Sequence, residues 1–83
     1  MFYTYIILSQ KTGILYKGFT TDLEKRLEEH NSGLSSYTSK HIPWILVLFE
    51  VHLTKKEALK REKWYKTGVG RDWIKRQLLE NKD

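Results

Sequence analysis

Apolar and polar positions in the N-terminal part of the chain follow the pattern of a β-hairpin. Residues 3–9 are dense in β-branched and aromatic side chains, residues 10–13 are turn-like, and residues 14–19 resume the first pattern. Side chains of this kind favour strands, and a short polar break between two such runs favours a tight turn. The pattern therefore predicts two antiparallel strands.

Side-chain alternation along the two strands predicts which residues share a face. We take Ser9 and Ile14 as the pair that closes the turn. Tyr5 then lies opposite Gly18, and Tyr16 is the diagonal neighbour of Tyr5 on the same face. Gly18 would leave a gap beside Tyr5. Ordinary strand aromatics would give the same pattern, because tyrosine is enriched in strands.

A first helix is predicted over about residues 22–31. Thr21 and Glu24 form the T-x-x-E capping-box pattern, and leucines recur after it at helical spacing. Gly33 follows as the stop signal. The hairpin is therefore followed directly by a short amphipathic helix.

A third strand is predicted after a polar loop. Residues 34–43 are polar, whereas residues 44–53 are almost continuously apolar. A strand with one wet face alternates apolar and polar side chains, so this continuous run predicts a strand that is covered on both sides.

Two further helices are predicted in the last third of the chain. A second T-x-x-E pattern begins at Thr54 and predicts a helix that runs to about Lys66. Two glycines, Gly68 and Gly70, are expected to break it. Residues 71–80 then have the pattern of a third helix.

The order β-β-α-β-α-α with short links predicts an α+β fold: a small three-stranded, largely antiparallel sheet flanked by helices. A chain of 83 residues fits a single domain over residues 1–83. The absence of cysteine excludes a disulfide framework, a thiolate zinc site and a cysteine nucleophile, and fits a reducing compartment. No apolar stretch approaches the roughly 20 residues of a membrane span, and no secretory signal precedes the first strand, so we expect a cytoplasmic protein with no membrane partner.

The positive charge is concentrated in the last third of the chain. The net charge is +5, and residues 1–50 are neutral in sum, so residues 51–83 hold the whole excess. A local field of this sign raises the encounter rate with polyanions such as nucleic acid. A soluble, lysine-rich surface would have the same composition.

Arg26 and His30 stand four residues apart on the first predicted helix and therefore project side by side. We expect a cationic pair, because the glutamates of this helix lie elsewhere around it: Glu24, Glu28 and Glu29. An arginine fork fits a phosphate, and a histidine can move a proton near neutral pH. Solvated helix charges are the alternative.

Glu62 occupies a position where an apolar side chain is expected. Together with Ala58, Tyr65 and Val69 it follows the spacing of a buried helical stripe. A buried carboxylate needs a partner, because unpaired burial is costly. The spacing leaves two options open: neutralisation by an arginine or tyrosine, or coordination of a divalent metal.

These segments resemble the GIY-YIG nuclease superfamily. The first strand contains Tyr3-Thr4-Tyr5 and the second Tyr16-Lys17-Gly18, and they are followed by the helix TDLEKRLEEHNSG and the later REKWYK. The stretch SxYTSKxxPW, from Ser35 to Trp44, makes the chain similar to the small, stand-alone bacterial proteins of that superfamily.

The resemblance implies a metal-dependent phosphodiesterase site on one sheet face, with Mg²⁺ or Mn²⁺ as cofactor. It implies nucleic acid, and DNA in particular, as the partner, in repair or processing. It assigns catalytic roles to Tyr5 and Tyr16 of the two motifs, to Arg26 and His30 of the helix, and to Glu62 as the metal ligand.

Further candidates for contacting the substrate are Lys17, Gly18, Asn31, Thr38 and Lys40. The chain departs from the family pattern at Tyr3, where the family name has glycine, and at Lys17, where isoleucine or valine is usual. Because strand side chains alternate, Lys17 should face away from Tyr16 and affect packing or DNA contact more than chemistry.

Three functions remain compatible with the sequence. The first is a metal-dependent endonuclease that hydrolyses phosphodiester bonds of DNA. The second is a nucleic-acid binding module that retains the fold and cuts little or nothing. The third is a small interaction protein whose aromatic residues only fill a core.

Overall fold

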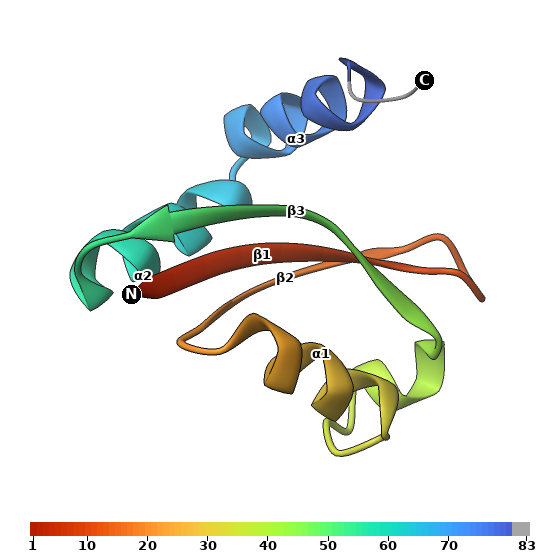
Figure 1. The fold of residues 1–83 in the computed structure, drawn as a ribbon. Helices are drawn as coiled ribbons and strands as arrows, with labels where there is room; N and C mark the ends of the chain where they lie inside the picture. Colours follow the sequence, from red (N-terminus) through yellow and green to blue (C-terminus); the bar gives the residue numbers. More distant parts are fainter. Residues whose placement is uncertain (81–83) are drawn as a thin grey trace.

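The structure, a computed structural model, describes residues 1–80 of the 83-residue chain. One antiparallel sheet has the strand order β2-β1-β3 and is flanked by helices (Figure 1). The elements, in chain order, are β1 (Phe2–Ser9), β2 (Leu15–Thr20), α1 (Leu23–Asn31), the short 3₁₀ helix η1 (Thr38–His41), β3 (Trp44–His52), α2 (Lys55–Tyr65) and α3 (Gly68–Glu80). The α+β class and the order β-β-α-β-α-α are confirmed.

The register of the hairpin is as predicted. Tyr5 pairs with Gly18, and the Ser9 N–H donates to the Ile14 carbonyl at 2.9 Å. Tyr16 therefore lies on the same face as Tyr5, two pairs further along the strands. The alternation of side chains was sufficient to place both phenols, because the short turn allows a single in-phase pairing.

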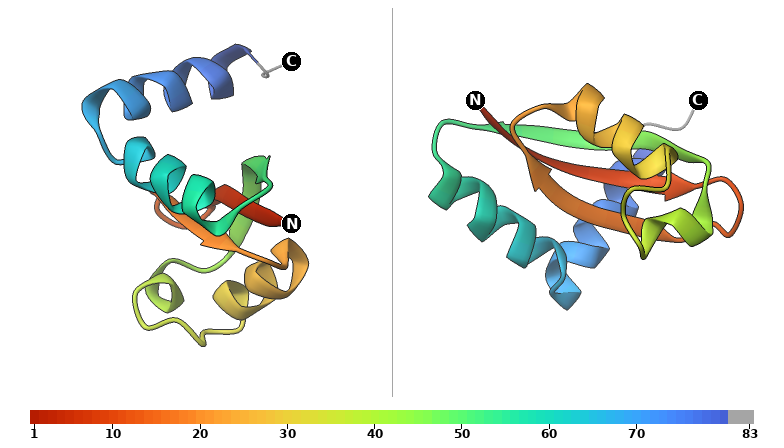
Figure 2. Two further views of the ribbon diagram at one scale, coloured as in Figure 1. Left: turned by 90° about the vertical axis from the view of Figure 1, so that its left-hand side faces the viewer. Right: turned by 90° about the horizontal axis from the view of Figure 1, so that it is seen from below.

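The two faces of the sheet carry separate cores (Figure 2). The α1 and η1 helices cover one face, where Tyr5, Ile7 and Trp44 are buried. The α2 and α3 helices cover the other face, where Ile6, Tyr65 and Ile74 are buried. Since adjacent residues of β1 point to opposite faces, this central strand contributes to both cores.

The prediction that the third strand is covered on both sides is wrong. β3 is an edge strand that pairs only with β1, and four of its apolar side chains are exposed: Ile45 (39%), Leu46 (36%), Phe49 (49%) and Val51 (48%). The helices on each face are too short to cover the whole length of this strand. A continuous apolar run shows that a segment is a strand, but it does not show where the strand lies in the sheet.

The cap of α1 lies one residue later than predicted. The Asp22 carboxylate, rather than the Thr21 hydroxyl, accepts the N–H of Lys25 at 3.1 Å. The cap of α2 is confirmed, because the Thr54 hydroxyl accepts the N–H of Glu57 at 3.1 Å. Both helices therefore begin with a side chain that satisfies a free N–H group.

The prediction that Gly68 and Gly70 interrupt the helical region is wrong in part, because α3 begins at Gly68 and includes both. Gly70 is buried where α3 crosses the end of α2, and a β-carbon there would overlap the Trp64 carbonyl and approach Tyr65 Cα at 2.9 Å. The glycine at position 70 therefore permits close helix packing.

None of the helices within residues 1–80 is long and apolar enough to cross a bilayer.

We predict that Gly70→Ala lowers the free energy of unfolding by about 2 kcal/mol, because an added methyl group meets rigid backbone at the helix crossing. Gly68→Ala is the matched control, since a β-carbon at Gly68 meets nothing within 4 Å. Urea unfolding of the two variants measures the difference. Equal stabilities would contradict the crossing as the reason for the glycine.

Candidate active site

The phenol of Tyr5 lies across the backbone of Gly18. A β-carbon at Gly18 would overlap the Tyr5 hydroxyl and ring, so only glycine leaves room for this side chain. Tyr16 lies beside it on the same face, with ring centroids 6.5 Å apart. The space that Gly18 leaves open, which was predicted as a gap, is occupied by the Tyr5 side chain. The Tyr5 hydroxyl reaches toward β2, which forms an edge of the sheet.

His30 connects the two phenols to the loop after α1. It lies in the last turn of α1, is completely buried, and its Nε2 atom lies 2.8 Å from the Tyr5 hydroxyl. Its Nδ1 atom lies 2.8 Å from the Thr38 hydroxyl, and its ring meets that of Tyr16 at a centroid distance of 5.1 Å. Both ring nitrogens are therefore bonded inside the protein.

The imidazole of His30 is neutral at physiological pH. Burial, and then the positive charge of Arg26, lowers the pKa of His30 to about 4. The expectation that Arg26 and His30 form a cationic pair is therefore wrong, because full burial of the ring disfavours its charged form. In a neutral ring one nitrogen donates and the other accepts.

Arg26 is held by a glutamate of its own helix. Its Nη1 donates to Glu29 Oε1 at 2.9 Å, and this hydrogen bond raises the pKa of Arg26. The expectation that Glu29 lies elsewhere around the helix is wrong, because residues three apart are also neighbours on a helix surface. The guanidinium keeps donors that Glu29 does not use, since it has five N–H groups.

The hydroxyl of Tyr5 is protonated at neutral pH. Burial raises the pKa of Tyr5 to about 12, although the neighbouring Arg26 acts to lower it. Glu62 also acts to raise this pKa, so its carboxylate lies within electrostatic range of the phenol. The charges of Arg26 and Glu62 therefore act on the pKa of the Tyr5 hydroxyl in opposite directions.

Glu62 is only half-buried, and its partner differs from those predicted. Its side chain keeps 22% of its surface exposed, and the carboxylate accepts from Lys66 Nζ at 3.2 Å. The predicted stripe holds for Ala58 and Tyr65, which are both fully buried, but Val69 is 66% exposed. The stripe fails there because α2 ends at Tyr65, and Val69 belongs to the next helix.

Glu62 fits a weakly held divalent cation. Within the part of the chain that the structure describes, no three histidine or acidic side chains form a preassembled metal cluster. Mg²⁺ typically keeps several waters and binds through one or two carboxylates together with substrate phosphates. A partly exposed carboxylate paired with an exposed lysine suits this manner of binding, because Lys66 can turn away into solvent.

The α2 helix that carries Glu62 is anchored by a partly buried hydrogen-bond network on the other sheet face. The Thr4 hydroxyl lies 2.8 Å from that of Tyr65, and the Tyr65 hydroxyl donates to Glu50. Arg61 binds the same carboxylate with Nε at 2.8 Å. Although burial acts to raise the pKa of Glu50, the hydrogen bonds from Arg61 and Tyr65 hold it below its usual value. These contacts set the rotation of α2 on the sheet.

The structure places the predicted substrate contacts in three environments. Lys40 is exposed, and Lys17 points to the sheet face opposite the phenols, as alternation predicts. Asn31 holds the start of β3, since its side chain bonds both the carbonyl of Trp44 at 3.0 Å and its N–H at 2.7 Å. Thr38 is completely buried against His30. We therefore assign Asn31 and Thr38 a positioning role.

Tyr37 was not singled out in the sequence, although its ring is 53% exposed beside the phenols. Its centroid lies 6.1 Å from that of Tyr16 and 5.3 Å from that of His41. The sequence feature that could have indicated Tyr37 is its position in the stretch SxYTSKxxPW, because this loop packs against the α1 face of the sheet. An exposed ring at this point offers a stacking surface for a nucleobase.

We predict that burial of neutral His30 makes the fold acid-sensitive. Because its pKa falls from 6.5 to about 4 on folding, the unfolded chain binds the proton more tightly. Stability is then fully present above pH 6.5 and is lost as the pH falls toward 4, by up to about 3 kcal/mol from this residue.

Urea unfolding between pH 7 and pH 4 measures this loss, with His30→Gln and the half-exposed His41→Gln as a matched pair. The His30 variant should have lower stability at pH 7 and a flatter pH dependence. A pH dependence that is the same in both variants would contradict the burial of a neutral ring.

Comparisons with known proteins identify the family of this chain. The model of the GIY-YIG catalytic domain matches residues 1–75. A UPF0213 protein of Bacillus licheniformis is 40% identical over 63 residues, which cover 75% of this chain and 65% of that protein, less than two thirds of its length. The UPF0213 protein YsiG of Lactococcus lactis is 40% identical over 87 residues, covering 98% of this chain and 82% of that protein.

A solved structure has the same architecture. It is the solution NMR structure of a UPF0213 protein from Bacillus halodurans, which is 31% identical, covers 89% of this chain and 82% of that one, and superposes with a TM-score of 0.52. The resemblance drawn from the YTY and YKG motifs is thereby confirmed. The match extends over nearly the whole length of the described residues, and it shows that the chain belongs to the GIY-YIG family, a superfamily of nucleases.

Proposed function

We propose that this protein is a divalent-metal-dependent endonuclease that hydrolyses phosphodiester bonds of DNA in repair or processing, in the cytoplasm. The observation that carries the proposal is the contact among Tyr5, Tyr16 and His30, from β1, β2 and α1, with Arg26 and Glu62 acting on the pKa of the Tyr5 hydroxyl. They combine a phosphate-binding cation, a carboxylate and a hydrogen-bonded phenol–imidazole pair. This set of groups is suited to phosphoryl transfer, where catalysis consists of positioning and charge stabilisation.

Arg26 and Glu62 would bind the phosphate from two sides. Arg26 offers the N–H groups that Glu29 leaves free to the non-bridging oxygens, where charge develops. Glu62 would hold one Mg²⁺ or Mn²⁺. When bound, such a cation supplies Lewis-acid stabilisation of the phosphate and the leaving oxygen. The ordinary partner of Glu62, Lys66, is 56% exposed and can leave it.

Tyr5 and His30 would orient the attacking water and accept its proton. When His30 Nδ1–H donates to Thr38, His30 Nε2 accepts from the Tyr5 hydroxyl, and the oxygen of Tyr5 can accept from water. As water loses a proton to Tyr5, Tyr5 passes its own proton to His30. Neither group is a strong base, but the loose transition state of phosphoryl transfer requires little help from the nucleophile.

A nucleic-acid binding module that cuts little or nothing is the second candidate. The observation that favours it is the ion pair between Lys66 and Glu62, which occupies the carboxylate needed for metal binding. Lys17 in the second motif also replaces the usual apolar residue. Both features are compatible with binding of the phosphate backbone alone.

We predict that Glu62→Gln and Arg26→Ala each lower the cleavage rate by about 100-fold, because each removes a group that stabilises transition-state charge. The assay uses a panel of labelled forked, flapped and linear DNAs with Mn²⁺, and a parallel reaction with chelator. The matched controls are Glu80→Gln at the exposed end of α3 and Lys25→Ala, the exposed neighbour of Arg26. Unchanged rates in folded Glu62 and Arg26 variants would exclude these assignments, and absence of cleavage by the unmodified chain would favour the binding module.

We predict that Tyr5→Phe lowers the single-turnover cleavage rate constant by about 100-fold, because it keeps the ring over Gly18 and removes only the hydroxyl that links water to His30. Tyr3→Phe is the matched control, since Tyr3 lies on the same face of β1 and its ring contacts Phe49 at a centroid distance of 6.4 Å. Both variants are compared by single-turnover cleavage below their unfolding temperatures. Equal losses in the two would show that the effect comes from packing.

A further inference from the structure

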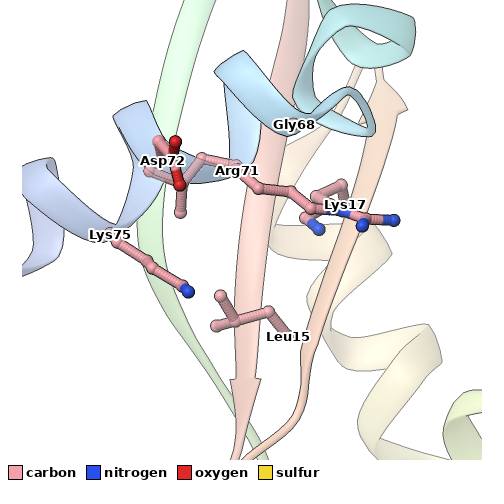
Figure 3. Close-up of a pocket in the computed structure, with 7 residues that line it drawn as sticks. Leu15, Lys17, Gly68, Arg71, Asp72 and Lys75 are labelled. Carbon is pink, nitrogen blue, oxygen red and sulfur yellow. The ribbon is translucent and has the colours of Figure 1, made fainter.

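A positively charged hollow lies on the sheet face opposite the phenols, between α3 and β2 (Figure 3). Its volume is about 310 Å³. Arg71 extends from α3 toward Lys17 on β2, and Lys75 points into the space beside Leu15 (Figure 3). The remaining lining residues are Gly68, Asp72 and Ile74. Three cations from two elements far apart in the sequence therefore share one hollow.

The cations in this hollow are not neutralised by the protein. Among residues 1–80, neither Lys17, Arg71 nor Lys75 forms a salt bridge, whereas the bridges that do form involve other cations. Asp72 is the single acid in the lining, so the hollow has a formal excess of two positive charges. Burial, and then the charges of Arg71 and Lys66, lowers the pKa of Lys17.

This arrangement costs free energy in the isolated chain, because like charges converge and one of them is partly removed from water. A solvated lysine on a free surface would not have this cost. An anion in the hollow would offset the repulsion and replace the lost hydration with charge-assisted hydrogen bonds. The hollow is therefore suited to an anion.

The anion site adjoins the candidate active site at the outer edge of β2. Lys17 stands between Tyr16 and Gly18 in the strand, so its side chain points to the face opposite the phenols, the face that α2 and α3 cover. Lys66, which pairs with Glu62 at 3.2 Å, lies close enough to lower the pKa of Lys17. Positive charge thus continues from Lys66, the partner of Glu62, to Lys17 in the hollow.

We propose that Lys17, Arg71 and Lys75 bind a backbone phosphate of the nucleic-acid strand, next to the phosphate held at Arg26 and Glu62. The proposal rests on the proposed function for the position of the cut. It commits to a strand phosphate because Leu15 and Ile74 line the hollow with apolar surface on which a sugar can pack. It also explains Lys17, the residue at which the second motif departs from the family pattern.

Binding of labelled forked DNA to the full chain, measured with chelator present while the KCl concentration is raised, tests the proposal without any cleavage step. The Lys17→Gln/Arg71→Gln double variant should bind about tenfold more weakly, and its log–log salt slope should fall by about 2, because two phosphate-contacting charges are removed. Lys55→Gln/Lys56→Gln is the matched control, since both lysines are exposed in the first turn of α2, at the far end from Lys66. Urea unfolding confirms that both double variants are folded.

A salt slope and affinity equal to those of the Lys55/Lys56 control would overturn the proposal. A second arm measures binding of inorganic phosphate by NMR: a loss for phosphate with no loss for DNA in the Lys17/Arg71 variant would also overturn it. Cleavage by the unmodified chain with Mn²⁺ is measured separately. Absence of cleavage ends the nuclease proposal, whereas an unchanged salt slope ends only the assignment of the hollow.

Discussion

The arrangement of the whole molecule depends on two adjacent residues of the central strand. Thr4 and Tyr5 point to opposite faces of β1, and each hydroxyl ends in a buried hydrogen bond to a residue from a helix. Tyr5 meets His30 of α1, and Thr4 meets Tyr65 of α2. A slip of one residue in the register would exchange the two faces and break both contacts. The strand therefore fixes the two helices that carry Arg26, His30 and Glu62.

The hairpin register and the proximity of the two phenols could be predicted from the sequence because both follow from local alternation along a short turn. The state of His30 could not be predicted in this way. Its burial depends on the loop that packs Thr38 against it, and a polar stretch gives no periodic signal of such packing. The helical spacing correctly placed His30 beside Arg26, but it could not predict the burial of the His30 ring, which lowers its pKa.

The remaining differences have the same origin in tertiary contacts. Gly70 was predicted to break a helix because glycine has low helix propensity. The close crossing of α3 over α2 at Trp64 nevertheless requires a glycine at this position. The apolar run of β3 indicated a strand. Its place at the sheet edge follows from the strand order, because β1 lies in the centre and pairs with β2 on one side and with β3 on the other. Lys66 became the partner of Glu62 because α2 turns that position toward solvent rather than toward a buried arginine.

In so small a chain, the candidate site and the core are largely the same residues. Tyr5, His30, Thr38 and Trp44 are all buried, and the indole of Trp44 donates to the Thr38 carbonyl at 2.9 Å. A domain of this size without disulfides has little other buried surface to stabilise it. Stability and chemistry cannot be varied independently at such positions, since a large truncation removes both. The low pKa of His30 illustrates the link: the burial that keeps the ring neutral, and so able to accept a proton from Tyr5, is the same burial that acid disrupts.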